Sequence, residues 1–231
     1  MADWFQKLWR IGLLLSLLLL TGCLQYDLDI QFDSQTHGQL VQQLHWRGSA
    51  AANSDLQAWL EVLSDRAALV GGRTEFLDNQ SFAITVPFNN GQELADRFND
   101  FFQSAATETP FTLPSGDPIQ AEMSLQQGNW IFAIYNHLAL RVDLTAVPDL
   151  TKTGLPLLQG QQLLDGHVTL TAPWVRSRAQ ALTQAESWSL VPGAVNTIEA
   201  DFWVPSPIGI GAAVILLVVA IGYVAKYGLR N

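Results

Sequence analysis

The chain has 231 residues, a net charge of −9 and a single cysteine. Four of its 12 basic residues but only one of its 21 acidic residues lie outside residues 24–205, so this central stretch carries a charge of about −12. Such a charge argues against a nucleic-acid-binding protein, which needs Lys and Arg to neutralise phosphates, and against electrostatic docking on anionic lipid. One cysteine allows no disulfide within the chain, so packing must stabilise the fold.

Residues 1–22 have the layout of a secretory signal peptide. Lys7 and Arg10 precede an apolar run over residues 11–20, and small residues lead from this run to Cys23. The run is shorter than the ~20 residues that a membrane-spanning helix needs. The three residues before the cysteine are typical of a bacterial lipobox: Leu20, Thr21 and Gly22. We therefore expect cleavage before Cys23 and lipid attachment to its thiol.

Residues 23–205 are expected to form one extracytoplasmic α+β domain, with a mainly antiparallel sheet built from hairpins and two packed helices. Strict alternation of apolar and polar residues over 24–33, a polar turn and a second alternating run over 40–46 predict the first hairpin. Apolar residues at helical spacing predict a helix that begins near Ser54 and an aromatic-faced helix that begins near Asn90.

The second half of the domain is expected to consist mainly of strands. The connection over 104–118 is rich in proline, and we favour a fold-back of its Phe111 and Leu113 over the core, with insertion into the bilayer as the alternative. Residues 127–129 are expected to form a hairpin turn. Further strands are expected near 121–125, 130–135, 138–144, 167–171, 188–190 and 197–203.

A second apolar run, residues 208–225, has no charged side chain and is long enough to cross the ~30 Å hydrocarbon core of a bilayer. We expect a transmembrane helix over 206–225 and a cytoplasmic tail over 226–231, because basic residues follow the run. Since the first strand starts beside Cys23 and the last ends at Pro205, we also expect both ends of the domain to lie at one pole, against the bilayer.

Four large aromatic residues are candidates for the lining of an apolar-ligand cavity: Trp59, Phe98, Phe102 and Trp130. The alternative is that they are ordinary core residues of a closed domain. Arg176 and Arg178 follow Trp174 and form a local basic pair, either as solvated loop charges or as a phosphate or headgroup contact.

Catalysis has no support in the sequence. The nucleophile-elbow, phosphate-loop and zinc-protease motifs are absent, and the four histidines are dispersed: His37, His45, His137 and His167. We therefore expect a protein that is not an enzyme and that has no metal site and no cofactor. A cryptic hydrolase remains as a weaker alternative, and a buried carboxylate pair beside a pocket would revive it.

Several segments together resemble a known family. They are the lipobox, the hairpin that follows it, residues 188–193 (WSLVPG), residues 196–199 (NTIE) and residues 202–205 (FWVP). The chain resembles an uncharacterised family of cyanobacterial and plastid membrane proteins and, more remotely, the LppM-like lipoproteins of actinobacteria. The resemblance implies a lipid-anchored α+β domain with a C-terminal helix and, for the LppM-like relatives, a lipid-binding role. It implies no catalytic residue.

We expect a doubly anchored lipoprotein of a plasma or thylakoid membrane, with its domain on the periplasmic or lumenal side and its C-terminus in the cytoplasm. The leading interpretation is an interaction or assembly protein that contacts a membrane protein complex. The alternative is a module that binds lipid or another apolar ligand. Nucleic acid is not an expected partner.

Overall fold

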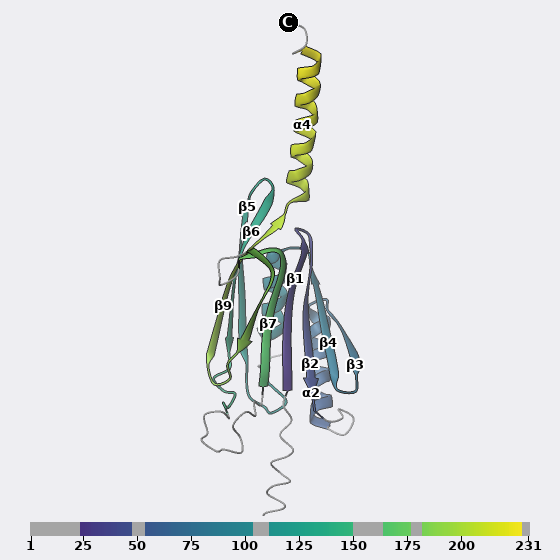
Figure 1. The fold of residues 1–231 in the computed structure, drawn as a ribbon. Coiled ribbons are helices and arrows are strands. Elements are labelled where there is room, and N and C mark those ends of the chain that lie inside the picture. Colours follow the sequence, from purple (N-terminus) through teal and green to yellow (C-terminus); the bar gives the residue numbers. More distant parts are fainter. Residues whose placement is uncertain (1–23, 48–53, 104–110, 150–163, 177–181, 228–231) are drawn as a thin grey trace, which may run out of the picture.

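The computed structural model describes residues 24–47, 54–103, 111–149, 164–176 and 182–227. In these ranges nine strands form one curled, mostly antiparallel sheet, two helices pack on one face of it, and a third helix projects from one end (Figure 1). The predicted α+β class is confirmed. The helices are α2 (Ser54–Leu69), α3 (Gly91–Gln103) and α4 (Pro207–Tyr227). The strands are β1 (Leu24–Ser34), β2 (His37–Trp46), β3 (Arg73–Asp78), β4 (Ser81–Phe88), β5 (Gln120–Asn129), β6 (Ala133–Asp143), β7 (Leu164–Arg176), β8 (Leu182–Leu190) and β9 (Val195–Pro205).

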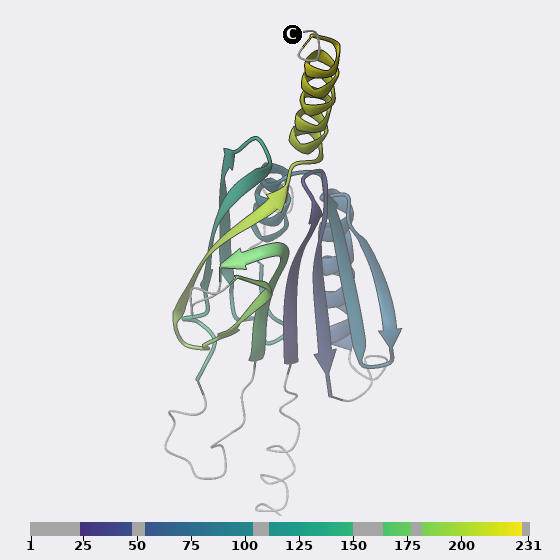
Figure 2. The same cartoon turned by 45° about the horizontal axis from the view of Figure 1, so that its top comes forward.

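The sheet joins two sets of hairpin strands through a parallel pair. Its order is β3-β4-β2-β1-β7-β9-β6-β5, and β8 pairs with β7 outside this path. β1 and β7 run parallel, with Leu24 opposite Leu164, and the sequence did not predict this pairing. The register of β7 shifts between Thr171 and Val175, and the residues beyond the shift pair with β9. Pro173 lies in this shift and donates no ladder hydrogen bond. The curl of the sheet is visible in Figure 2.

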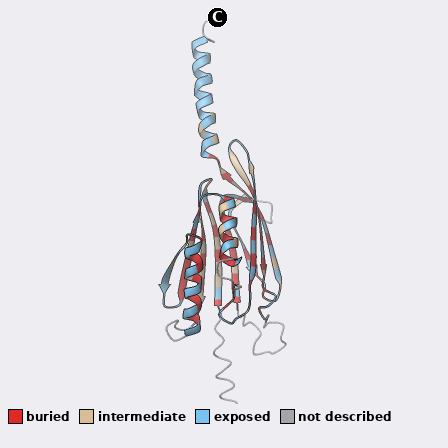
Figure 3. Ribbon diagram, turned by 180° about the vertical axis from the view of Figure 1, so that it is seen from behind, coloured by how far each residue is buried: buried red, intermediate tan, exposed pale blue. Residues whose placement is uncertain are grey.

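The core lies between the sheet and the two helices. Alternate residues of β1 and β2 point inward and are buried, as the period-two pattern predicts. The apolar faces of α2 and α3 meet them, and Figure 3 shows that buried and exposed residues alternate along both helices. Phe111 and Leu113 of the connection are also buried, so the favoured fold-back over the core is confirmed.

The two packed helices begin and end at recognisable signals. Asn90 caps α3, because its Oδ1 accepts a hydrogen bond from the Glu93 backbone N–H at 2.9 Å. Gly71 follows α2 with φ 72°, a left-handed conformation that glycine adopts without steric cost. These termini fix the lengths of both helices and hence the positions of their inward side chains.

α4 is an apolar helix of 21 residues that is long enough to cross a membrane, and the rest of the described domain buries none of its most apolar window. This length and composition are compatible with single-pass membrane anchoring. α4 leaves the domain directly from the end of β9 (Figure 1).

The expectation that both ends of the domain lie at one pole is wrong. The ring of Phe32, near the end of β1, lies 4.7 Å from that of Phe202, close to the exit toward α4. Leu24 is eight residues back along the same extended strand, which corresponds to about 26 Å at ~3.3 Å per residue. β1 therefore begins at the end of the sheet opposite to α4 (Figure 1). The parallel β1–β7 pairing, which the sequence did not predict, underlies this arrangement.

The predicted hairpin turn at residues 127–129 is also wrong in position. β5 continues to Asn129, which pairs with Ile134 of β6. The turn lies at Trp130–Ala133, where the Trp130 N–H donates to the Ala133 carbonyl at 2.9 Å and the reverse bond measures 3.2 Å. The prediction was wrong because it took Gly128 as a turn residue. This glycine lies within β5, and the centre of the turn is Ile131-Phe132.

Candidate functional site

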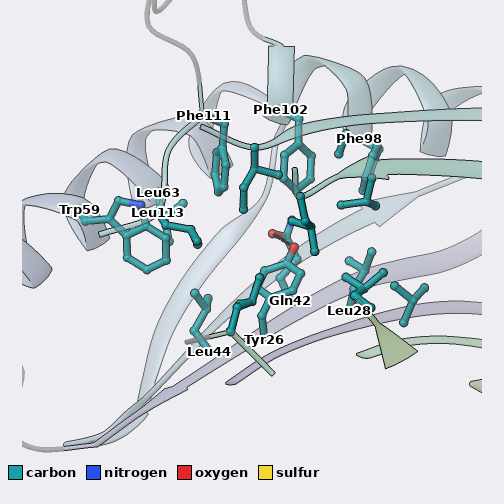
Figure 4. Close-up of a pocket in the computed structure, with 17 residues that line it drawn as sticks. Tyr26, Leu28, Gln42, Leu44, Trp59, Leu63, Phe98, Phe102, Phe111 and Leu113 are labelled. Carbon is teal, nitrogen blue, oxygen red and sulfur yellow. Dashed lines mark hydrogen bonds between the residues drawn. The ribbon is translucent and has the colours of Figure 1, made fainter. Parts of the chain in front are cut away.

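An apolar cavity lies between the concave side of the sheet and helices α2 and α3 (Figure 4). Its volume is about 30 Å³; in a comparable measure one water molecule needs about 10–15 Å³. The cavity therefore has room for about two waters in this conformation. The lining residues come from both helices, six strands and the connection: Tyr26, Leu28, Gln42, Leu44, Trp59, Leu63, Phe98, Phe102, Phe111, Leu113, Ile119, Ala121, Val142, Leu144, Leu164, Val168 and Leu190.

Three of the four residues proposed from the sequence as cavity lining meet here. Trp59 comes from α2, and Phe98 and Phe102 come from α3, with ring centroids 4.7 Å apart. Trp130 does not belong to the cavity, and this part of the prediction is wrong. The shifted hairpin turn places Trp130 at the tip of β5 and β6, where it is 69% exposed.

Besides the indole N–H of Trp59, the polar side-chain groups among the described lining residues are those of Tyr26 and Gln42. The Tyr26 hydroxyl donates a hydrogen bond to Gln42 Oε1 at 2.9 Å. Burial in apolar surroundings raises the pKa of Tyr26 far above its ordinary value, so the phenol remains a neutral donor. Alternation along β2 turns Gln42 toward the core, where its side chain is 1% exposed.

The amide nitrogen of Gln42 has no hydrogen-bond acceptor among the described residues. Because Gln42 Oε1 already accepts from Tyr26, the unpaired group is a donor, and Figure 4 shows this amide among the apolar side chains of the wall. An unsatisfied buried donor costs about 1–3 kcal/mol. The site is thus an apolar hollow, and among the described residues its wall contains one buried, unpaired NH2 group, that of Gln42. The sequence indicated neither Tyr26 nor Gln42 as a site residue, although the inward phase of β2 could have pointed to a buried glutamine.

A hydrogen bond and aromatic contacts hold the connection over one side of the cavity. The Trp59 Nε1–H donates to the Thr112 carbonyl at 2.6 Å, and the ring of Phe111 packs against that of Phe102 at an angle of 55°, with centroids 4.8 Å apart. Arg66 is 1% exposed, and its Nη1 donates to the Phe101 carbonyl at 2.8 Å. These contacts join α2, α3 and the connection into one cover over the sheet. The sequence did not mark Arg66 as buried.

Titratable groups cluster elsewhere, on the outer face of the sheet. Asp201 accepts hydrogen bonds from Tyr135 at 2.5 Å and from His137 at 2.8 Å. Burial alone would raise the pKa of Asp201, but these two bonds and the charges of His137 and Arg176 together lower it. The guanidinium of Arg176 lies 5.5 Å from the ring centroid of Trp203. Arg176 thus has both an aromatic and an acidic neighbour within the sheet.

Within the described ranges, no group of three or more His, Cys, Asp or Glu side chains is placed to hold a metal ion. The cavity lining contains no carboxylate in those same ranges. The signal peptide, the lipobox residues Leu20, Thr21 and Gly22, the lipid-attachment residue Cys23, and Arg178 lie outside the described residues.

Comparisons with known proteins place the chain in a family. None of the curated proteins matches it. The NMR structure of the folded domain of the LppM protein of Mycobacterium tuberculosis is similar at 17% sequence identity and a TM-score of 0.43, over 80% of this chain and 91% of that one. A family model described as a protein of unknown function, DUF3153, matches residues 28–228. This match includes most of the sheet, both packed helices and α4, and the chain therefore belongs to the DUF3153 family.

Proposed function

We propose that this protein is a membrane-anchored, non-enzymatic binding module. Its domain takes an apolar ligand with one oxygen acceptor into the cavity between sheet and helices. α4 crosses a plasma or thylakoid membrane, with the domain on the periplasmic or lumenal side. The observation that carries the proposal is the unpaired amide of Gln42, buried among apolar side chains.

The chemistry of the cavity defines the ligand class. Apolar walls favour a hydrocarbon chain or ring, and the Gln42 N–H favours an ester, carbonyl or hydroxyl oxygen. The surface of the cavity is apolar in this conformation, so Gln42 must turn its NH2 group toward the ligand; an oxygen there would then satisfy the amide and recover the cost of its burial. A carboxylate is disfavoured, because none of the described side chains that line the cavity is cationic.

The size of the cavity sets a condition on this function. A volume of about 30 Å³ is too small for a lipid chain, so the cover formed by α2, α3 and the connection must move outward on binding. The bond from Trp59 to the Thr112 carbonyl and the packing of Phe111 against Phe102 are the contacts that such a movement would loosen.

The test is to purify the full chain in mild detergent, extract its bound small molecules and identify them by mass spectrometry. Wild type is expected to retain one apolar species in near-stoichiometric amount. Gln42→Leu, which removes the donor, and Ala121→Leu, which fills the cavity, are expected to lose most of it. Gln43→Leu is the matched control. Gln43 is next to Gln42 in β2 but lies on the outer face of the strand, so this variant is expected to retain the ligand. Equal retention by all four proteins, or water alone in the cavity, would contradict the proposal.

The small cavity also favours a second candidate, an interaction or assembly protein with a closed core. The edge strand β3 exposes Phe76 and Leu77, and an unpaired strand edge can accept a strand from a partner. Substitution Phe76→Lys would then remove a specific partner from complexes captured from solubilised membranes, while Gln42→Leu would leave that partner bound.

A further inference from the structure

The turn between β5 and β6 exposes three consecutive large apolar side chains. Trp130 is 69% exposed, Ile131 71% and Phe132 58%. We name residues 130–132 the hairpin tip. A tight turn in water normally has Gly, Asn, Asp, Pro or Ser at its centre, whereas Ile131-Phe132 forms the centre here, and residues 129–134 contain no charged side chain. Neither turn geometry nor core packing accounts for this composition.

The hairpin tip is held against the first turn of α4. The Ser206 N–H donates to the Phe132 carbonyl at 2.9 Å. Gly209 lies so close to the tip that a Cβ at this position would overlap the Ile131 carbonyl oxygen. The tip thus lies at the level where α4 begins, and Figure 1 shows the β5–β6 hairpin extending beside the base of this helix.

We infer that the hairpin tip is a second membrane contact, which inserts into the bilayer interface beside α4. The inference rests on the proposal that α4 spans the membrane. A helix that enters the bilayer at residues 207–208 brings residues 130–132 to the same depth, because the two segments are hydrogen-bonded to each other. Trp and Phe are favourable at this depth, where an apolar ring meets hydrated headgroups.

Strands β6, β7 and β9 carry further groups suited to the interface. Tyr135 and Trp203 are neighbours with ring centroids 5.4 Å apart, and the Arg176 guanidinium lies over Trp203. Aromatic rings and an arginine near the tip are typical of the headgroup layer of a bilayer. The occupant of this surface is therefore a lipid bilayer.

The test uses the photoreactive residue p-benzoylphenylalanine in the full chain, reconstituted in vesicles of phosphatidylcholine and phosphatidylglycerol. It is placed at Phe132, at Phe76 as the matched control, and at Ile215 within α4. Phe76 is an exposed phenylalanine on the edge strand β3, away from α4. After irradiation, phospholipid adducts are measured by mass spectrometry. We expect the adduct yield at Phe132 to exceed that at Phe76 by at least about tenfold and to approach that at Ile215.

The three positions separate the two claims. An adduct at Ile215 together with a yield at Phe132 no higher than at Phe76 would overturn the inference and leave the spanning helix intact. Absence of an adduct at Ile215 would instead refute the span on which the inference rests. The same variants are also irradiated in native membranes. A protein adduct at Phe132 in place of a lipid adduct would overturn the inference as well.

Discussion

At the scale of single residues, the least expected feature of the core is a buried arginine. Arg66 lies on the inward face of α2, next to the buried apolar residues Leu63 and Ala67. Its partner, the Phe101 carbonyl, is in the last turn of α3, where carbonyls lack partners within the helix. Arg66 therefore caps α3 from a neighbouring helix.

We expect Arg66→Met to lower the free energy of unfolding by about 1–3 kcal/mol, because it leaves the Phe101 carbonyl buried and unpaired. The measurement is thermal and chemical unfolding of the full chain in detergent micelles. Arg73→Met is the control, since Arg73 is exposed on β3 and its replacement should change stability little. Equal effects of the two substitutions would show that Arg66 does not cap α3.

Asp201 gives the fold a predictable response to acid. Its pKa in the folded protein lies below the ordinary value of 3.8, so the ionised form stabilises the fold. This contribution is present above the unfolded pKa and is lost as the pH falls through the folded pKa. The unfolding temperature should therefore drop below about pH 4, and less steeply for Asp201→Asn. Glu199→Gln, on the exposed side of β9, should retain the wild-type profile.

At the scale of secondary-structure elements, most segments could be predicted from periodicity, but the pairing of strands that are distant in sequence, such as β1 and β7, could not. The period-two runs predicted the β1–β2 hairpin, and the helical spacing predicted α2 and α3. The β5–β6 turn was misplaced because Gly128 and Asn129 are typical turn residues, while Ile131-Phe132 is not. The apolar turn becomes understandable only beside α4, which is distant in sequence.

The contact between the hairpin tip and α4 depends on the absence of a side chain at Gly209. Gly209→Ala should break the hydrogen bond from the Ser206 N–H to the Phe132 carbonyl, because the new Cβ would overlap the Ile131 carbonyl. We expect hydrogen exchange at the Ser206 amide to become up to about tenfold faster, since such a bond contributes about 0.5–1.5 kcal/mol. Gly211→Ala is the control, because a Cβ there meets nothing within 4 Å. Unchanged exchange in Gly209→Ala would show that the contact is loose.

At the scale of the whole molecule, three of the four residues proposed from the sequence do line the cavity. The hydrogen-bonded pair of Tyr26 and Gln42 could not be proposed in this way. Trp59, Phe98 and Phe102 lie on amphipathic faces that any packing brings inward. The meeting of Tyr26 and Gln42 requires the register of β1 against β2, in which Tyr26 faces Leu44 and Leu28 faces Gln42. A pattern within one strand does not determine that register.

The positions of the two ends of the domain restrict how two anchors can share one bilayer. β1 begins at the pole opposite to α4, and Cys23 directly precedes it. A lipid on Cys23 and a spanning α4 therefore reach the same membrane only if the long axis of the domain lies along its surface. With α4 as the only anchor, the domain can stand upright.

We expect Cys23→Ser to abolish lipid attachment and to leave the protein in the membrane fraction through α4. The measurement is fractionation of cells that express the full chain, followed by carbonate extraction. Deletion of residues 207–227 in the same Cys23→Ser background is the comparison for the loss of both proposed anchors. Recovery of Cys23→Ser in the soluble fraction would refute the spanning helix.

Pairing of a ligand oxygen with the buried amide of Gln42 can be observed directly by NMR. The full chain is labelled with ¹⁵N-glutamine, and the side-chain signal of Gln42 is assigned from its loss in Gln42→Leu. Removal of bound lipid by solvent extraction and refolding is expected to shift the Gln42 amide signal, while that of Gln43 on the outer face stays in place. If the Gln42 signal is the same before and after this treatment, the cavity holds no ligand and the account is contradicted.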